Sequence, residues 1–346
     1  MLHQVQERFE SSGCQRQRSG SGLDEQQTLR NIEAEVSELI DLAAIRHRIT
    51  RSQKISGRFQ RQASVRASIL RRSPQGHIGG PNSAVEGGAM FELYDFRFSH
   101  YSEKARWALD FKGITYASRH LLPGFHMRTT RKLAPRTCVP ILKVDAIVIQ
   151  DSTEIINFLE QTFPHRSLTP PDPRDANEAV EWEEYLDEEI GATLRLWFYY
   201  HALPDRNRAV RFLSQGAPWH QRSLLALSFT PIRRAMTQMM NIHAGSASES
   251  ERRFLTALDR LDKTLERSPF LVGNRFSRAD LTACALLWPL CRPGESESEV
   301  ESLLPAPVCA LRKQLYHRRF YCWALEKYLE YRTPELQRPC QRGRAN

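Results

Sequence analysis

The sequence has 346 residues, of which 41% are hydrophobic and 9% aromatic, so two domains with sizeable cores are expected. Its formal net charge is +9, but the arginines are scattered and no basic helix carries interleaved aromatics, so we expect no nucleic-acid partner. The longest apolar run, Leu281–Leu290, contains a proline and is too short to span a bilayer, so we expect no membrane partner.

The number and spacing of the cysteines indicate which cellular compartment and which kind of metal site are compatible with the sequence. The seven cysteines are odd in number, irregularly spaced and free of Cys-x-x-Cys pairs, which argues against a disulfide framework and against a zinc site. We therefore expect no metal and a reducing compartment. The first residues lack the pattern of a secretory signal, and the sequence predicts a cytoplasmic protein.

Residues 1–89 differ from the rest of the chain. They are rich in Arg, Ser, Gln and Gly and poor in aromatics, so they bury too little apolar surface to offset the entropy of ordering. The sequence predicts a disordered basic extension here. Within it, one stretch places apolar residues at helical spacing, namely Leu29, Ile32, Val36, Ile40 and Ala43.

From Met90 onward, strand-like and helix-like segments alternate. Phe91–Phe96 alternates apolar and polar residues, which predicts a strand, and Tyr101–Gly113 has helical spacing with a glycine at its end. A strand, a helix, two strands and a helix are then predicted at Thr115–Leu121, Thr129–Leu133, Val139–Val144, Ala146–Ile149 and Ser152–Thr162. This order is the thioredoxin-like pattern, so residues 90–165 are expected to form an α/β domain around a mixed four-stranded sheet.

A proline-rich stretch follows this predicted domain and is typical of a linker. Beyond it, only helical patterns occur. We expect helices at Asp175–Ala202, Asn207–Ser214, Arg222–Met240, Ser248–Glu266, Ser277–Leu290, Ala306–Gln314 and His317–Tyr331. Residues 174–333 are therefore predicted as an all-helical domain, and residues 334–346 as a frayed tail.

Three short motifs are candidates for chemistry. Ser99 precedes the first helix, where free N–H groups and the helix dipole favour an anion such as a thiolate, although this motif taken alone favours a plain N-cap. Val139-Pro140 opens a strand that looks buried, and both a cis bond and an ordinary trans proline are open there. Asp151-Ser152 begins another helix, where Ser152 and its N–H either hold a carboxylate or only cap the helix.

A fourth motif concerns stability. Ser277 and Asp280 have the spacing of a capping box, and Phe276 precedes them as a hydrophobic staple. We expect this motif to fix the start of a helix and to have no part in catalysis.

Taken together, in this order and at this spacing, the motifs resemble the cytosolic glutathione S-transferase superfamily, especially its bacterial and zeta/omega-like branches with Ser or Cys at the active site. The resemblance implies glutathione as co-substrate and Ser99 as the catalytic hydroxyl that stabilises its thiolate. It implies that the backbone of Val139, ahead of a cis Pro140, pairs with the cysteinyl part of glutathione. It further implies that Asp151 and Ser152 hold the γ-glutamyl end.

Other residues compete for roles in this site. Ser102, in the first helical turn, is a second candidate for the catalytic hydroxyl, and Tyr94 is a third. Cys138, beside the expected ligand site, is either a redox-sensitive thiol or a small buried hydrophobe, and we expect the second. The omega-like branch has cysteine where Ser99 stands, so disulfide exchange is not expected here, because a hydroxyl forms no mixed disulfide. Arg195 is a candidate for favouring acidic substrates.

The resemblance thus implies an enzyme that adds glutathione to a small electrophile, or uses it for an isomerisation, and that works as a homodimer. The alternative is a binding or regulatory protein that keeps the fold with weak catalysis, since fold does not fix function. The intact serine, Val-Pro and Asp-Ser motifs favour the enzyme.

Overall fold

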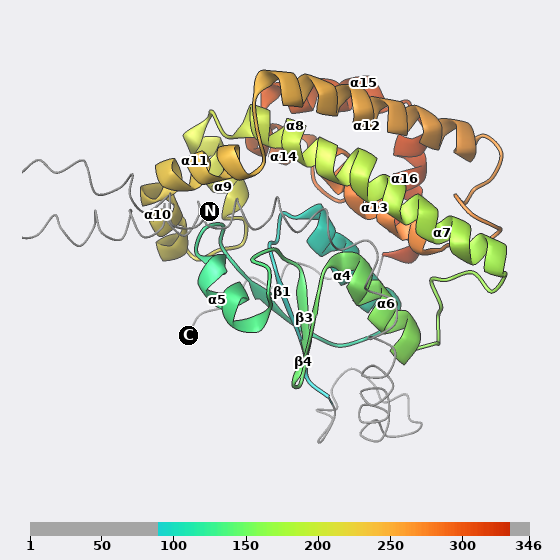
Figure 1. Ribbon diagram of the computed structural model, residues 1–346. Coiled ribbons are helices and arrows are strands. Elements are labelled where there is room, and N and C mark those ends of the chain that lie inside the picture. Colours follow the sequence, from blue (N-terminus) through green and yellow to red (C-terminus); the bar gives the residue numbers. More distant parts are fainter. Residues whose placement is uncertain (1–88, 333–346) are drawn as a thin grey trace, which may run out of the picture. The chain divides into compact units, whose positions relative to one another are not determined.

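One sheet of four short strands opens the described part of the chain. The computed structural model describes residues 89–332; the predicted disordered extension, its helix around residues 29–43 and the frayed tail lie outside them. The strands are β1 (Phe91–Asp95), β2 (Ala117–His120), β3 (Ile141–Val144) and β4 (Ile147–Gln150), in the order β2-β1-β3-β4. β1 is parallel to β2, whereas β3 is antiparallel to both β1 and β4, so the predicted mixed sheet is confirmed (Figure 1).

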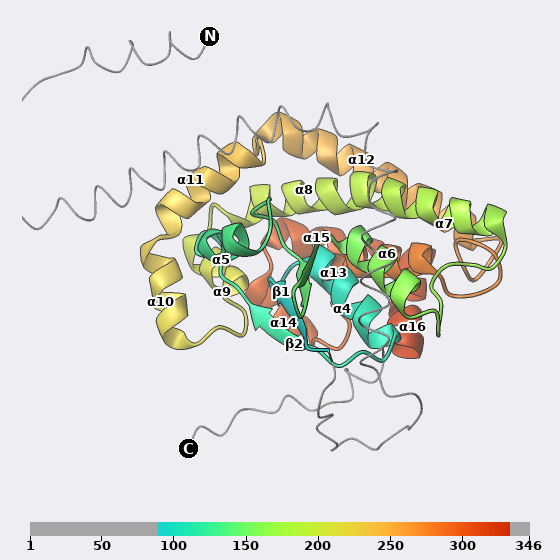
Figure 2. The ribbon, with the colours of Figure 1, turned by 60° about the horizontal axis from the view of Figure 1, so that its bottom comes forward.

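Three helices accompany the sheet, in the thioredoxin-like order. They are α4 (His100–Phe111), α5 (His126–Leu133) and α6 (Ser152–Thr162). α5 lies on the opposite side of the strands from α4 and α6 (Figures 1 and 2). α4 is buried on most of its surface because it contacts both α6 and α13 (Arg278–Cys291), a helix of the all-helical part. The start of α4 is therefore held between two layers.

The helical part begins with a long helix that is interrupted. The sequence predicts one helix over Asp175–Ala202, whereas the structure has α7 (Pro173–Leu186), a π-helical segment η1 (Asp187–Ala192) and α8 (Thr193–Ala202). α7 begins at the N-cap Asp172, with proline in the first helical turn, where no N–H is required. π-helical turns are rare and frequently occur at functional sites.

The next region contains three short helices rather than two. They are α9 (Arg206–Leu213), α10 (Trp219–Leu227) and α11 (Phe229–Met239), so the single helix predicted over Arg222–Met240 is wrong. The break falls at Ser228, three residues before Pro231. Proline cannot donate a backbone N–H and is tolerated only in the first turn of a helix, which requires a new helix to start here.

The remaining helices are α12 (Ala244–Leu265), α13, α14 (Glu297–Leu303), α15 (Ala306–Leu315) and α16 (Arg319–Tyr331). α14 was not predicted from the sequence; it is a short helix that starts with a capping box of Ser296 and Glu299. The predicted capping box at the start of α13 is confirmed, with Ser277 and Asp280 bonded reciprocally. Phe276 stacks on Tyr331 of α16, with ring centroids 4.1 Å apart. An α/β thioredoxin-like part is thus followed by an all-helical part.

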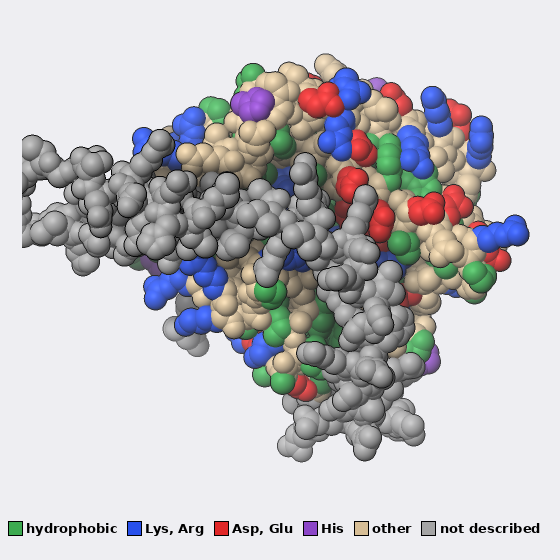
Figure 3. All heavy atoms as spheres, viewed as in Figure 1, with side chains coloured by type: hydrophobic (Ala, Val, Ile, Leu, Met, Phe, Trp, Pro, Cys, Tyr) green, Lys and Arg blue, Asp and Glu red, His purple; other side chains and the backbone are tan. Residues whose placement is uncertain are grey.

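The surface and the helix lengths bear on the partner classes considered above. Lys, Arg, Asp and Glu side chains are interspersed over the helices at the upper right of Figure 3, rather than separated by sign. Within residues 89–332, no helix is long and apolar enough to cross a bilayer.

Candidate active site

Ser99 stands at the junction of the first strand and helix. It is the N-cap of α4, and its Oγ accepts a hydrogen bond of 3.3 Å from the N–H of Ser102. Its side chain is half-buried. Ser102 differs, because it is fully buried and its Oγ accepts from the N–H of Phe96 at 3.4 Å. The Ser99 hydroxyl is thus at the positive end of a helix and partly accessible, whereas the Ser102 hydroxyl is turned into the fold.

The residue between these serines ties α4 to the helical part. The Tyr101 hydroxyl donates to the backbone oxygen of Asp187 in η1 at 2.9 Å. Burial raises the pKa of Tyr101, so its hydroxyl stays protonated as a donor. The neighbouring His100 is buried, and burial together with the Arg195 charge lowers its pKa to about 3, so the ring is neutral at pH 7. Tyr94 lies on the central strand β1, between Arg119 of β2 and Ile141 of β3.

The two motifs after the first helix meet at one corner. The Val139–Pro140 peptide bond is cis, and the Pro140 carbonyl accepts from the N–H of Asp151 at 3.1 Å. Asp151 is the N-cap of α6 and accepts from the N–H of Thr153, while Ser152 is buried as the first residue of the helix. Asp151 has a φ of 103°, a strained conformation that residues other than glycine adopt rarely and mostly at functional sites.

A glutamine braces this corner and was not singled out from the sequence. The side-chain amide of Gln150 donates to the backbone oxygens of Arg136 and Cys138, at 2.6 and 2.8 Å, and its oxygen accepts from the N–H of Arg136. Its position directly before Asp151 was the only sequence signal. Cys138 is exposed, so the expectation of a buried hydrophobe there is wrong. It lies in the loop before the cis-proline rather than on the strand.

A buried ion network joins the beginnings of α4 and α6 to the helical part. The Lys104 ammonium lies 2.7 Å from carboxylate oxygens of both Glu183 and Asp187, and donates to Thr153 Oγ1 at 3.0 Å. Glu183 also pairs with Arg278 of α13. Burial alone would lower the pKa of Lys104, but the two carboxylates outweigh it and raise the pKa. Because Thr153 follows the Asp151-Ser152 motif, this network sets the two helix starts side by side.

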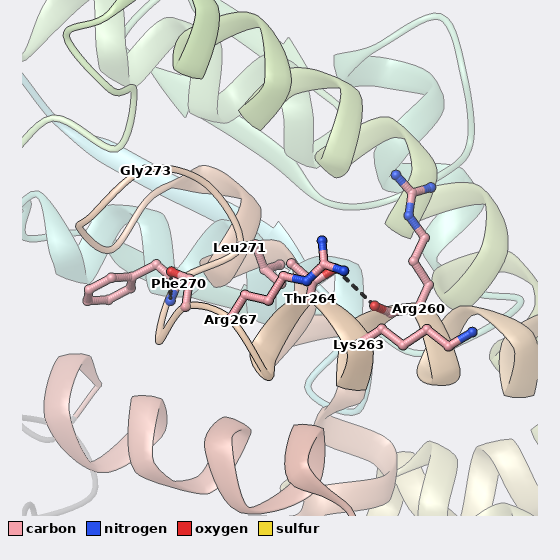
Figure 4. Close-up of a pocket in the computed structure, with 8 residues that line it drawn as sticks. Arg260, Lys263, Thr264, Arg267, Phe270, Leu271 and Gly273 are labelled. Atoms are coloured by element: carbon pink, nitrogen blue, oxygen red, sulfur yellow. Dashed lines mark hydrogen bonds between the residues drawn. The ribbon is translucent and has the colours of Figure 1, made fainter.

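One hollow in the described residues lies away from these motifs. It measures about 280 Å³, and its lining includes Arg260, Lys263, Thr264, Arg267 and Phe270 at the end of α12 (Figure 4). None of the predicted site residues lines it. Within residues 89–332, no three His, Cys, Asp or Glu side chains are grouped as a metal site would require.

Family models match the chain in two places. Residues 93–170 match the glutathione S-transferase N-terminal domain, and residues 228–313 match the glutathione S-transferase C-terminal domain. The first match contains Ser99, the Val139-Pro140 pair and Asp151-Ser152, and the second contains the Ser277–Asp280 capping box.

Two relatives cover much of the same region. Glutathione S-transferase TCHQD from Arabidopsis thaliana is 28% identical over 205 residues, which are 57% of this chain and 75% of the relative. The protein LigF from Sphingobium sp. is 28% identical over 214 residues, 59% of this chain and 80% of that protein. The crystal structure of the β-etherase LigF from Sphingobium sp. is 25% identical, with a TM-score of 0.47, and covers 69% of this chain and 99% of its own.

Proposed function

Since the chain belongs to the glutathione S-transferase superfamily, we propose that it binds glutathione, stabilises its thiolate and adds it to a small electrophile, or uses it to isomerise one. The observation that carries this proposal is the half-buried Ser99 hydroxyl at the amino end of α4, joined through Lys104 and Thr153 to the start of α6. A thiolate needs a donor and a positive potential, and this position supplies both.

The roles of the other residues follow from the same placement. We propose that Ser99 donates to the glutathione sulfur, in preference to Ser102, whose hydroxyl is buried and bonded to the N–H of Phe96. The Val139 backbone, before the cis peptide bond, is available to pair with the cysteinyl part of glutathione. Asp151 would attract the γ-glutamyl ammonium, and Ser152 with the N–H groups of α6 the γ-glutamyl carboxylate.

Catalysis then has a simple energetic basis. A free cysteine thiol has a pKa of about 8.5, so only a few per cent is ionised at pH 7. A hydrogen bond from Ser99 and the dipole of α4 stabilise the thiolate over the thiol, which lowers the pKa of the bound thiol. The thiolate is the nucleophile, and an electrophile held beside it reacts at a high effective concentration.

Superfamily membership also supports wider proposals. We propose that residues 90–165 carry the glutathione site and residues 174–333 most of the electrophile site, and that the protein is a cytoplasmic homodimer. The exposed free thiols of Cys138 and Cys322 fit a reducing compartment. Light scattering coupled to size exclusion would measure the mass in solution, and a monomer at micromolar concentration would contradict the dimer.

The decisive experiment compares four variants of the full chain, Ser99→Ala, Ser102→Ala, Asp151→Ala and Ser296→Ala, by calorimetry with glutathione and by titration of the bound thiol. We expect Asp151→Ala to weaken binding. We expect Ser99→Ala to bind but to return the thiol pKa toward its free value, with kcat/KM lower by about 100-fold. Ser296→Ala is the control, since Ser296 is also an N-cap serine whose side chain accepts a backbone N–H, but it is exposed and starts α14.

The results decide between the two candidate serines and between the two candidate functions. If Ser99→Ala leaves the thiol pKa and kcat/KM unchanged while Ser102→Ala alters them, Ser99 is not the catalytic hydroxyl. If the folded parent protein binds no glutathione at millimolar concentration, the fold serves a binding or regulatory role without glutathione chemistry.

A further inference from the structure

Arg195 is a cation of the helical part that lies beside the start of α4. It is the third residue of α8, and its guanidinium carbon is 5.4 Å from the centroid of the Tyr101 ring. The side chain is half-buried, and its buried Nε has no hydrogen-bond partner. Among residues 89–332, Arg195 forms no ion pair, whereas the nearby Lys104 and Arg278 are held by carboxylates.

The charge of Arg195 acts on the start of α4. After burial, it is the largest influence that lowers the pKa of His100, next to Ser99. The guanidinium, which lies over the Tyr101 ring and acts on His100, is therefore next to the amino end of α4 that carries Ser99.

A partly buried guanidinium without a counter-ion is unfavourable, because it has lost hydration without gaining a partner. The Tyr101 ring offers a cation–π contact, which replaces only part of that hydration. Glu183 Oε1 and Asp187 Oδ2 are bonded to Lys104. Asp187 Oδ1 is buried without a hydrogen-bond partner, but none of the carboxylates among residues 89–332 forms an ion pair with Arg195. The guanidinium therefore lacks a counter-ion, and its fork is suited to bind a carboxylate through two parallel hydrogen bonds.

We propose that Arg195 binds a carboxylate of the second substrate, so that the electrophile of this protein is an organic acid. This inference rests on the proposed glutathione chemistry. The γ-glutamyl carboxylate is assigned to the start of α6, whereas Arg195 approaches from α8 on the Tyr101 side. Arg195 is thus a specificity-determining residue, and Ser99 remains the group at the thiol.

The test uses two electrophiles with the same reacting ring, para-chloro-meta-nitrobenzoate and its methyl ester, which lacks the carboxylate charge. In both, the glutathione thiolate attacks the ring carbon that bears chlorine. A carbon–sulfur bond forms, the carbon–chlorine bond breaks, and chloride leaves with the bonding electrons; the thiol proton has already passed to solvent. We expect the ratio of kcat/KM for the acid to kcat/KM for the ester to be higher in the parent protein than in Arg195→Met, a comparison that cancels the greater intrinsic reactivity of the ester.

The variants are Arg195→Met, Arg195→Lys and, as the matched control, Arg267→Met, which removes an exposed arginine at the hollow of Figure 4. We expect Arg195→Met to lower kcat/KM for the acid by about 10- to 100-fold and to leave the ester and glutathione affinity unchanged. Arg195→Lys should restore part of the loss, and Arg267→Met should have no effect. Thermal melting of each variant separates a folding defect from a binding defect.

Two results would overturn the inference. An equal loss on acid and ester would mean that Arg195 has only a structural role, and a weaker glutathione affinity would mean that the carboxylate belongs to glutathione. If the parent protein does not bind glutathione, the proposed glutathione chemistry fails, but the inference about Arg195 is not yet decided. Binding of the benzoate, measured directly by calorimetry with and without Arg195, then decides the inference by itself.

Discussion

Glu160 of α6 is the residue that holds the segment leading into the helical part. Its carboxylate lies 2.6 Å from the Lys112 ammonium. It also accepts hydrogen bonds from the Ser167 hydroxyl at 2.7 Å and from the N–H groups of Leu168 and Thr169 at 3.0 and 2.9 Å. Only 12% of this side chain is exposed. Substituting it should therefore loosen the linker between the two parts of the protein.

The size of the effect follows from the pKa. Burial would raise the pKa of Glu160, but Lys112 and the three donors of the linker outweigh it and lower the pKa from 4.5 to about 2. At 1.36 kcal/mol per pH unit this difference is worth about 3 kcal/mol, and solvent screening of the partly exposed carboxylate reduces it to about 2 kcal/mol. Glu160→Gln keeps the size but removes the charge, so we expect a loss of about 2 kcal/mol at pH 7.

The pH dependence gives a sharper test. A carboxyl whose pKa is depressed in the folded state contributes fully above about pH 5, and this contribution is lost as the pH falls from 4.5 toward 2. The difference in unfolding free energy between the parent and Glu160→Gln should therefore be largest at pH 7 and shrink below pH 4.5. Urea unfolding followed by tryptophan fluorescence at a series of pH values measures it.

The control is Glu178→Gln, which changes an exposed glutamate on α7. We expect it to alter stability by less than about 0.5 kcal/mol at any pH. A Glu160→Gln effect that is equally small, or one that does not change between pH 7 and pH 4, would refute the reasoning.

Two further predictions concern the contact between α4 and the interrupted helix. Lys104→Met leaves Asp187 without its ammonium partner and should lower the free energy of unfolding in urea by about 3–5 kcal/mol. The double variant with Asp187→Asn should lose less, and equal losses in the single and double variants would exclude the pairing as the cause. Gly191→Ala places a Cβ 2.4 Å from the Tyr101 hydroxyl oxygen and should cost about 1–3 kcal/mol, part of which Tyr101→Phe recovers in thermal melting. A fully stable Gly191→Ala protein would contradict the close approach.

The parts of the fold that local patterns determine were predictable. The four strands, α4 and α6 follow from alternation, helical spacing and caps, and the bounds of α6 agree residue for residue. The capping box at Ser277 was predicted because both of its partners lie within one turn. The cis bond before Pro140 was one of two open alternatives, since proline at a strand start is compatible with either isomer.

The parts that depend on distant contacts were not predictable. Lys104 looks like a surface residue in the sequence, and its burial follows from carboxylates about 80 positions further along the chain. The unpaired state of Arg195 depends on the same tertiary arrangement. The exposure of Cys138 contradicts the usual behaviour of cysteine, because a loop braced by Gln150 carries it outward. The glutathione roles themselves stay predictions until binding is measured.

The interruption at η1 makes chain length, rather than side-chain identity, a determinant of the site. A π turn accommodates an additional residue, so α8 is rotated by about 100° relative to a continuous helix. Deleting one residue from Asp187–Ala192 would restore a regular helix, so that either α7 or α8 would have to rotate about the helix axis. If α7 kept its orientation, Glu183 would stay at Lys104 and Arg195 would turn away from Tyr101; if α8 kept its orientation, the reverse would hold. Chains that differ by one residue here would thus present different helix faces to α4.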